Sequence, residues 1–114
     1  MALAVQRHTD IRRKYPRRDF KRNMGVLFNG EYVVCQGFEI GEGGISFLYP
    51  QELPEHLQAV VSFQVPGGGF TSVQVEVRRS FQHDSTDQFV IGCSFKEVSF
   101  EIKREIRTYV SARS

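Results

Sequence analysis

Residues 12–20, RRKYPRRDF, are the part of the sequence best equipped to bind a ligand. Four of the five cations in this stretch are arginines, and the fifth is Lys14. A guanidinium group is planar and always charged. It can hold a phosphate with two hydrogen bonds, stack on a base, or bind the O6 and N7 edge of guanine. The stretch therefore predicts a flat, anionic ligand, although composition alone also allows a solvated basic linker.

The net charge of +2 conceals an uneven distribution. Eight of the 15 basic residues lie between positions 7 and 22, where only Asp10 and Asp19 oppose them. The remainder of the chain is slightly acidic. A basic arm of this kind concentrates anions and speeds their capture. Because 114 residues suffice for one core, we expect a flexible N-terminal tail at 1–11 and a single domain at 12–114.

No local group of residues indicates catalysis. The three histidines, His8, His56 and His83, lie in polar surroundings typical of exposed positions, without a serine or cysteine partner in a recognisable arrangement. The glycine-rich stretches GEGG and PGGGF lack the spacing of a nucleotide-binding loop that precedes a helix. We therefore predict that the chain is not an enzyme and uses no cofactor.

The two cysteines do not indicate a metal site. Cys35 and Cys93 are far apart in the sequence, and no CxxC, HxxxH or HExxH pattern is present. Both lie inside apolar runs, which predicts reduced, buried thiols that act as small hydrophobic residues. The opening MALAV is too short for a signal peptide core or a membrane helix, so we expect a cytoplasmic protein with no membrane segment.

The chain after the basic arm must position the arginines, and its pattern of apolar residues predicts a series of strands. Asn29-Gly30 favours a type I′ turn, so residues 24–28 are expected to pair with residues 31–40 as a hairpin. Further strands are expected at residues 45–49, 57–65, 72–77 and 88–95. The loops between them are polar or rich in proline or glycine. Valines alternate with polar residues over 72–77, as in a strand with one buried face.

A helix is expected at the C-terminal end of the chain. Ser99 is suited to be its N-cap, and Ile102, Ile106, Tyr109 and Val110 share one helical face. The residues alone thus predict a mainly β fold of five or six antiparallel strands followed by one docked helix. A small barrel and a closed sandwich both fit this pattern.

Two short motifs connect the basic arm to this scaffold. Arg13 and Arg17 form an RxxxR pair, and residues 39–44, EIGEGG, follow across the expected hairpin. Their order and spacing resemble the PilZ domain family, which carries RxxxR in an N-terminal loop and [DN]xSxxG on a barrel. Downstream, VIGCSF resembles the late VGxxF strand of that family, and IKREIRTYV resembles its terminal helix. The resemblance extends over about residues 12–110.

The resemblance implies a six-stranded antiparallel β-barrel with a C-terminal α-helix. It also implies a bacterial receptor for the second messenger cyclic di-GMP, whose arginine-rich N-terminal loop becomes ordered when the ligand binds. An effector protein of the motility, pilus, secretion or polysaccharide machinery would read that change. The ligand-binding residues implied by the resemblance are Arg12, Arg13, Arg17, Arg18, Glu39, Gly41 and Gly44.

The second motif departs from the family pattern at two positions. Glu39 keeps a carboxylate that is one methylene longer than aspartate, and Gly41 replaces the serine and its hydroxyl. One neutral hydrogen bond is worth about 0.5–1.5 kcal/mol, compared with about 1.5–3 kcal/mol for a bond to a charged group such as arginine. We therefore expect cyclic di-GMP binding to be weakened but retained, and we expect Gly41→Ser to tighten it.

Two other functions compete with a cyclic di-GMP receptor. A degenerate PilZ adaptor would keep the fold, bind no cyclic di-GMP and act only through protein contacts, and the altered second motif favours it. A barrel that binds single-stranded nucleic acid would need exposed aromatic rings beside the cations. Only Tyr15 and Phe20 lie among these cations, so nucleic acid is the less favoured partner.

Overall fold

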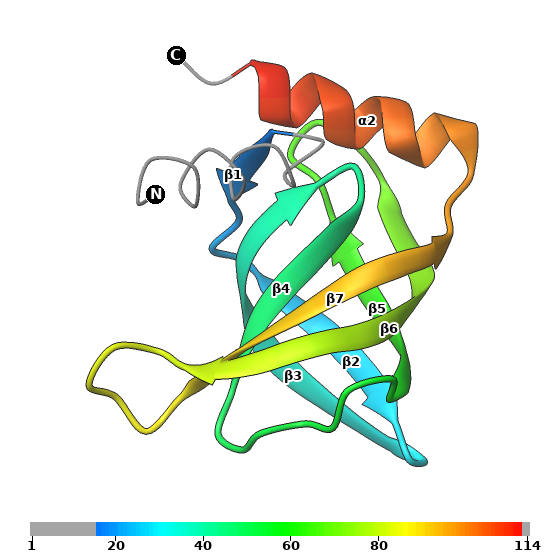
Figure 1. Ribbon diagram of the computed structural model, residues 1–114. Coiled ribbons are helices and arrows are strands. Elements are labelled where there is room, and N and C mark those ends of the chain that lie inside the picture. Colours follow the sequence, from blue (N-terminus) through cyan, green and yellow to red (C-terminus); the bar gives the residue numbers. More distant parts are fainter. Residues whose placement is uncertain (1–15, 113–114) are drawn as a thin grey trace, which may run out of the picture.

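The computed structural model of the protein describes residues 16–112, and within this range the chain forms seven strands and one helix (Figure 1). The strands are β1 (Arg17–Asp19), β2 (Asn23–Phe28), β3 (Glu31–Gly41), β4 (Gly44–Tyr49), β5 (Gln58–Gln64), β6 (Phe70–Gln82) and β7 (Phe89–Glu97), and the helix is α2 (Phe100–Ser111). The predicted tail at residues 1–11 lies outside the described residues, and the proposed domain boundary stays a prediction.

Six of these strands close into an antiparallel barrel. The hydrogen-bonded order is β3-β2-β5-β6-β7-β4, and β4 pairs with β3 to complete the ring. The short strand β1 lies outside the ring and extends the sheet at the C-terminal end of β3. Helix α2 lies across the end of the barrel nearest to β1 (Figure 1). The predicted six-stranded barrel with a C-terminal helix is confirmed.

The first hairpin forms where the sequence predicts it. Asn29 and Gly30 both have positive φ, 50° and 76°, as a type I′ turn requires. This turn sets the register of β2 against β3, in which Phe28 pairs with Glu31 and Met24 pairs with Cys35. The turn therefore determines which residues of β3 face outward as far as Gly37, where a bulge begins.

The barrel interior is filled by one face of each strand. The alternating residues Val73, Val75 and Val77 of β6 are all buried, as predicted. Phe20 is also fully buried and contacts Phe63 edge to face, with 5.9 Å between ring centroids. It is therefore a core residue that anchors β1 and is not available to stack on a nucleic-acid base. Tyr15, the other aromatic residue among the cations, lies outside the described residues.

Helix α2 begins and docks as its sequence pattern predicts. The Ser99 side chain accepts a hydrogen bond of 3.2 Å from the backbone N–H of Ile102, which caps the first turn. Ile106 and Val110 are buried against the barrel end. The docked helix places Tyr109 beside β1, where it contacts Arg18 and Asp19.

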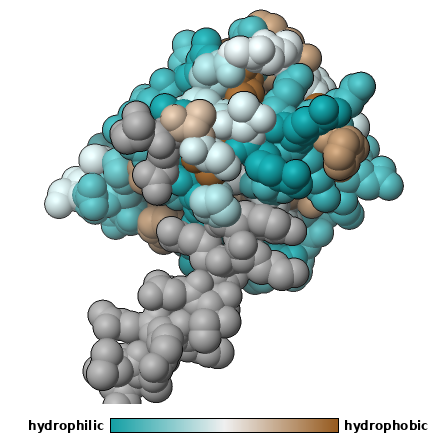
Figure 2. All heavy atoms as spheres, turned by 90° about the horizontal axis from the view of Figure 1, so that it is seen from above, coloured by the Kyte–Doolittle hydropathy of each residue, from teal (hydrophilic) through white to brown (hydrophobic). Residues whose placement is uncertain are grey.

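The face of the molecule that carries α2 is mainly hydrophilic. Apolar side chains on it are scattered among polar and charged ones and form no continuous patch in this view (Figure 2). Over the described range, no helix has the length and apolar character needed to cross a membrane.

Both cysteine side chains lie in the barrel, and their predicted burial is confirmed. Burial raises the pKa of Cys35 to about 11 and that of Cys93 to about 12. At about pH 8 a folded protein should therefore contain almost no thiolate. We expect Ellman's reagent to label the folded protein about a hundredfold more slowly than the urea-unfolded chain. Equal labelling rates in the two states would contradict the buried placement.

Candidate functional site

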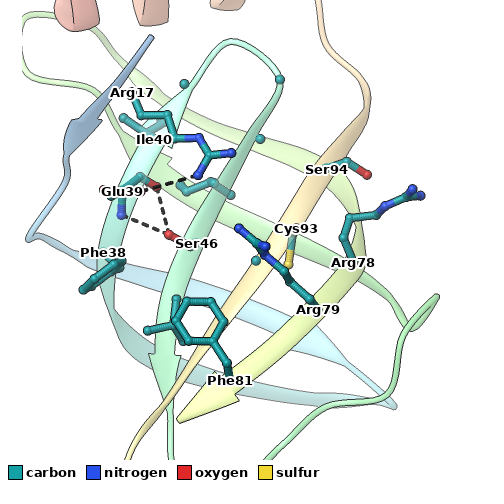
Figure 3. Close-up of a pocket in the computed structure, with 16 residues that line it drawn as sticks. Arg17, Phe38, Glu39, Ile40, Ser46, Arg78, Arg79, Phe81, Cys93 and Ser94 are labelled. Atoms are coloured by element: carbon teal, nitrogen blue, oxygen red, sulfur yellow. Dashed lines mark hydrogen bonds and ion pairs between the residues drawn. The ribbon is translucent and has the colours of Figure 1, made fainter. Parts of the chain in front are cut away.

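A pocket lies on the outer surface of the barrel, where β3, β4, β7 and β6 run side by side (Figure 3). Its volume of about 840 Å³ falls in the range of about 300–1,000 Å³ that is typical of small-molecule sites. One cross-strand row forms its centre, with each residue paired to the next: Glu39 on β3, Ser46 on β4, Gly92 on β7 and Arg79 on β6.

Pairing between β1 and β3 brings the two sequence motifs together at the edge of this pocket. Arg17 pairs with Gly41 and Asp19 pairs with Glu39, so Arg17 and Glu39 are diagonal neighbours on one face. Arg17 Nη1 lies 3.7 Å from Glu39 Oε1, and each side chain is about one-third exposed, at 38% and 34%. An ion pair at such an exposed position contributes only about 0.2–1 kcal/mol, so a ligand phosphate can displace it.

Ser46 holds the backbone around Glu39 in place. Its Oγ accepts a hydrogen bond of 3.1 Å from the Glu39 N–H and lies 3.4 Å from the Glu39 carbonyl oxygen (Figure 3). A bulge in β3 between Gly37 and Glu39 shifts the register beside this contact. Bulges often re-aim side chains near functional sites, and here both Phe38 and Glu39 line the pocket.

Close backbone approach explains two of the three glycines of the second motif, Gly41 and Gly44. A Cβ on Gly44 would collide with the Cys93 carbonyl oxygen of β7, so only glycine fits between these strands. A Cβ on Gly41 would lie 2.9 Å from the Pro16 carbonyl oxygen and 3.4 Å from Arg17 Cγ. This crowding argues against a simple restoration of the hydroxyl by Gly41→Ser, because Pro16 and the first residue of β1 occupy the space that a side chain there requires.

Arg18 faces the opposite side of β1, because successive side chains of a strand alternate. Its guanidinium donates a 2.8 Å hydrogen bond from Nη1 to the Tyr109 carbonyl oxygen and lies 4.1 Å from the centroid of the Tyr109 ring. The last carbonyls of a helix have no partner within the helix and carry partial negative charge. Helix α2 has no basic residue in its last turn. Arg18 of β1 therefore supplies the positive charge that stabilises these carbonyls.

Helix α2 also contacts the turn of the second motif. Arg107 donates from Nε and Nη2 to the two carboxylate oxygens of Glu42, at 2.9 and 3.1 Å. These hydrogen bonds lower the pKa of Glu42 below its ordinary value. Tyr109 Oη donates to the Asp19 carbonyl oxygen at 2.8 Å. The helix therefore links β1 to the β3–β4 turn, which are the two elements that carry the motifs.

The structure brings four of the seven predicted site residues to the pocket: Arg17, Glu39, Gly41 and Gly44. Arg18 is not among them, since it is directed toward α2. Arg12 and Arg13 lie outside the described residues. The ligand contacts of the seven residues are untested, and from the position of Arg18 beside α2 we expect no ligand contact from its side chain.

Sequence analysis missed the wall of the pocket that β6 forms. Arg78, Arg79 and Phe81 line it, although the strand expected at residues 72–77 was predicted to end at Val77. β6 in fact continues to Gln82 through a register shift between Val77 and Arg79. The signal in the sequence was the consecutive pair Arg78-Arg79, which interrupts strict alternation as a bulge does.

The described histidines show no catalytic arrangement with a nucleophile. His56 is bound to Glu76, with 2.7 Å between Nδ1 and Oε2. The ring of His83 lies edge on to Phe38, with 5.3 Å between centroids, and is more sheltered than the sequence suggests. Among the described residues, no cluster of His, Cys, Asp or Glu side chains could hold a metal ion. His8 lies outside this range.

The closed barrel, the terminal helix and the meeting of the two motifs define a PilZ-type domain. The PilZ domain pattern matches residues 11–112, so the chain belongs to the PilZ domain family. No curated protein sequence matches this chain.

Solved structures of longer proteins share the fold. The Bacillus subtilis inhibitor of motility, MotI/DgrA, aligns with a TM-score of 0.79 at 15% identity over 87% of this chain and 49% of its own. YcgR from Escherichia coli, in complex with c-di-GMP, aligns with a TM-score of 0.68 at 16% identity over 89% of this chain and 45% of its own. PlzA from Borreliella burgdorferi, also in complex with c-di-GMP, aligns with a TM-score of 0.66 at 15% identity over 96% of this chain and 45% of its own. The chain spans about half the length of these proteins.

Arg18 should matter for stability, because it joins β1 to the C-terminal end of α2. We expect Arg18→Ala to lower the free energy of unfolding by about 1–2 kcal/mol, through loss of a charge-assisted hydrogen bond and a cation–π contact. Arg17→Ala is the matched control and should cost less, about 0.2–1 kcal/mol, because its ion pair with Glu39 lies at an exposed position. Urea unfolding measures both, and equal losses would contradict the different placement of the two side chains.

Proposed function

We propose that this chain is a non-enzymatic receptor that binds cyclic di-GMP in the pocket beside β1 and passes the signal to a partner protein. The observation that carries the proposal is the meeting of Arg17 and Glu39, one residue from each motif, at the edge of a pocket of suitable size. The complexes of YcgR and PlzA with c-di-GMP support it, because these structures have the same fold.

The chemistry of the pocket suits a cyclic dinucleotide. Cyclic di-GMP presents two guanine bases and two negatively charged phosphates. The described lining contains three arginines and one carboxylate, so its balance is positive. Arg17 can grip a phosphate or the O6 and N7 edge of guanine, while Glu39 can accept hydrogen bonds from guanine N–H groups.

Ligand binding would change the surroundings of β1. A phosphate that engages Arg17 replaces its contact with Glu39, and the rest of the arginine-rich segment, including Arg12 and Arg13, would close over the ligand. Ordering of such a segment is a common switch. Since β1 and the β3–β4 turn both contact α2, the helix is the element through which a partner protein would sense the bound state.

A degenerate adaptor is the second candidate function. The observation in its favour is that β1 pairs with β3 along Gly41, where the family has a serine, and Arg17 is paired with Glu39. In this alternative the protein functions with β1 paired to β3 and Arg17 paired to Glu39, binds no cyclic di-GMP and acts only through protein contacts.

Calorimetry with cyclic di-GMP tests the proposal and separates it from the alternative. We expect a micromolar or lower Kd for the native chain and a loss of about tenfold or more in Arg17→Ala, because a charge-assisted hydrogen bond is worth about 1.5–3 kcal/mol. Arg18→Ala carries the same change of charge one residue away and should change Kd by about twofold or less once folding is verified.

Two outcomes of this titration would contradict the proposed function. Absence of heat at about 100 µM ligand would favour the adaptor, because a micromolar site would then be saturated. Equal losses in Arg17→Ala and Arg18→Ala would show that overall charge, and not the pocket, attracts the ligand.

Gly41→Ser provides a test of the close contact at β1. A Cβ at this position must displace Pro16, and adding atoms to a filled site typically costs about 1–3 kcal/mol. Part of that cost should appear as a rise in Kd for cyclic di-GMP of about three- to tenfold. Tighter binding by this variant would instead support the simple restoration of a missing hydroxyl.

A further inference from the structure

The β6 wall of the pocket carries two consecutive arginines whose placement results from a bulge. Val77 pairs with Cys93 and Arg79 pairs with Gly92, which leaves Arg78 as the extra residue in β6. A bulge lets neighbouring side chains of one strand reach the same surface. Both Arg78 and Arg79 consequently line the pocket, on the side opposite to β1.

The two arginines differ in partner and direction. Arg78 Nη1 lies 3.7 Å from Glu76 Oε2, and its guanidinium points away from the middle of the pocket (Figure 3). Arg79 has no carboxylate partner among the described residues, and its guanidinium points toward the middle of the pocket (Figure 3).

Small residues allow Arg79 to reach across the pocket. Its stem crosses Gly92, where a Cβ would lie 3.6 Å from Arg79 Cγ and 3.9 Å from Nε. The next residue of the cross-strand row is Ser46. Three strand spacings of about 4.8 Å separate the β3 and β6 backbones, so long side chains from the two sides can hold one ligand between them.

An exposed aromatic ring lies beside Arg79. Phe81 is 47% exposed, and the Arg79 guanidinium carbon lies 5.6 Å from its ring centroid. Such a ring next to a cation resembles the stacking platforms on which proteins bind nucleobases. A purine placed on Phe81 would gain ring contact there and a charged hydrogen-bond donor from Arg79.

We propose that Arg79 and Phe81 form a second nucleotide subsite at the β6 side of the pocket, which takes the half of a cyclic dinucleotide that Arg17 and Glu39 do not hold. This inference rests on the proposed function. Arg79 binds a phosphate or the guanine edge, and Phe81 stacks on the base. Because Glu39 offsets part of the charge of Arg17, Arg79 supplies the cation that the second phosphate requires.

Calorimetry with cyclic di-GMP on a set of single variants tests the subsite. Arg79→Gln keeps most of the stem over Gly92 and removes the charge, so it should fold normally and raise Kd about tenfold or more. Phe81→Ala should raise Kd about fivefold or more, since base stacking on an aromatic side chain is worth about 1–3 kcal/mol. Arg104→Gln on α2 is the matched control, because the Arg104 guanidinium also lies beside a phenylalanine ring but outside the pocket, and we expect it to change Kd by about twofold or less.

Native protein and Arg17→Ala, measured in the same series, separate failure of the subsite from failure of the proposed function. If the native protein binds, Arg17→Ala weakens binding and Arg79→Gln leaves Kd unchanged, the subsite is overturned and the receptor function stands. If Arg104→Gln weakens binding as much as Arg79→Gln, only the general positive charge of the protein matters and the subsite is also overturned. If native protein binds no cyclic di-GMP, both proposals fail.

Discussion

The pairing of β1 with the C-terminal end of β3 is the constraint on which the site depends. Three residue pairs, beginning with Arg17 and Gly41, fix the register of a strand that is otherwise polar and short. Phe20 anchors it from the core side. Because a strand alternates its side chains, this register sends Arg17 to the pocket and Arg18 to the helix. Two adjacent arginines thereby acquire different roles, one toward a ligand and one in the fold.

Residues without bulky side chains and two bulges shape the remainder of the site. Gly44 permits the backbones of β4 and β7 to approach, and Gly92 leaves the floor of the pocket low enough for Arg79 to lie over it. The bulges at Phe38 and Arg78 lie on the two outer strands of the pocket and turn additional side chains toward it. The same barrel with regular strands would present fewer polar groups to this surface.

Local signals in the sequence predicted the strands and the helix, whereas the closed six-stranded barrel was implied by the resemblance to the PilZ family. The Asn29-Gly30 turn, the valine alternation and the cap at Ser99 each involve only a few neighbouring residues. The role of Arg18 was not accessible in this way, since its partner Tyr109 is distant in the sequence and the contact exists only after α2 docks. The wall formed by Arg79 was missed because a bulge interrupts the alternation by which strands are recognised. The obstacle at Gly41 depends on where β1 docks, which the sequence does not specify.

Side-chain NMR of the arginines tests the central claim most directly, because each Nε–Hε group reports its own surroundings. On titration with cyclic di-GMP, the account predicts that the Arg17 signal shifts and exchanges more slowly with water. The Arg18 signal should keep its position, since that side chain stays bound to the end of α2. A shift of Arg18 as large as that of Arg17, or an Arg17 signal that does not respond at saturation, would contradict the division of the two arginines between ligand and fold.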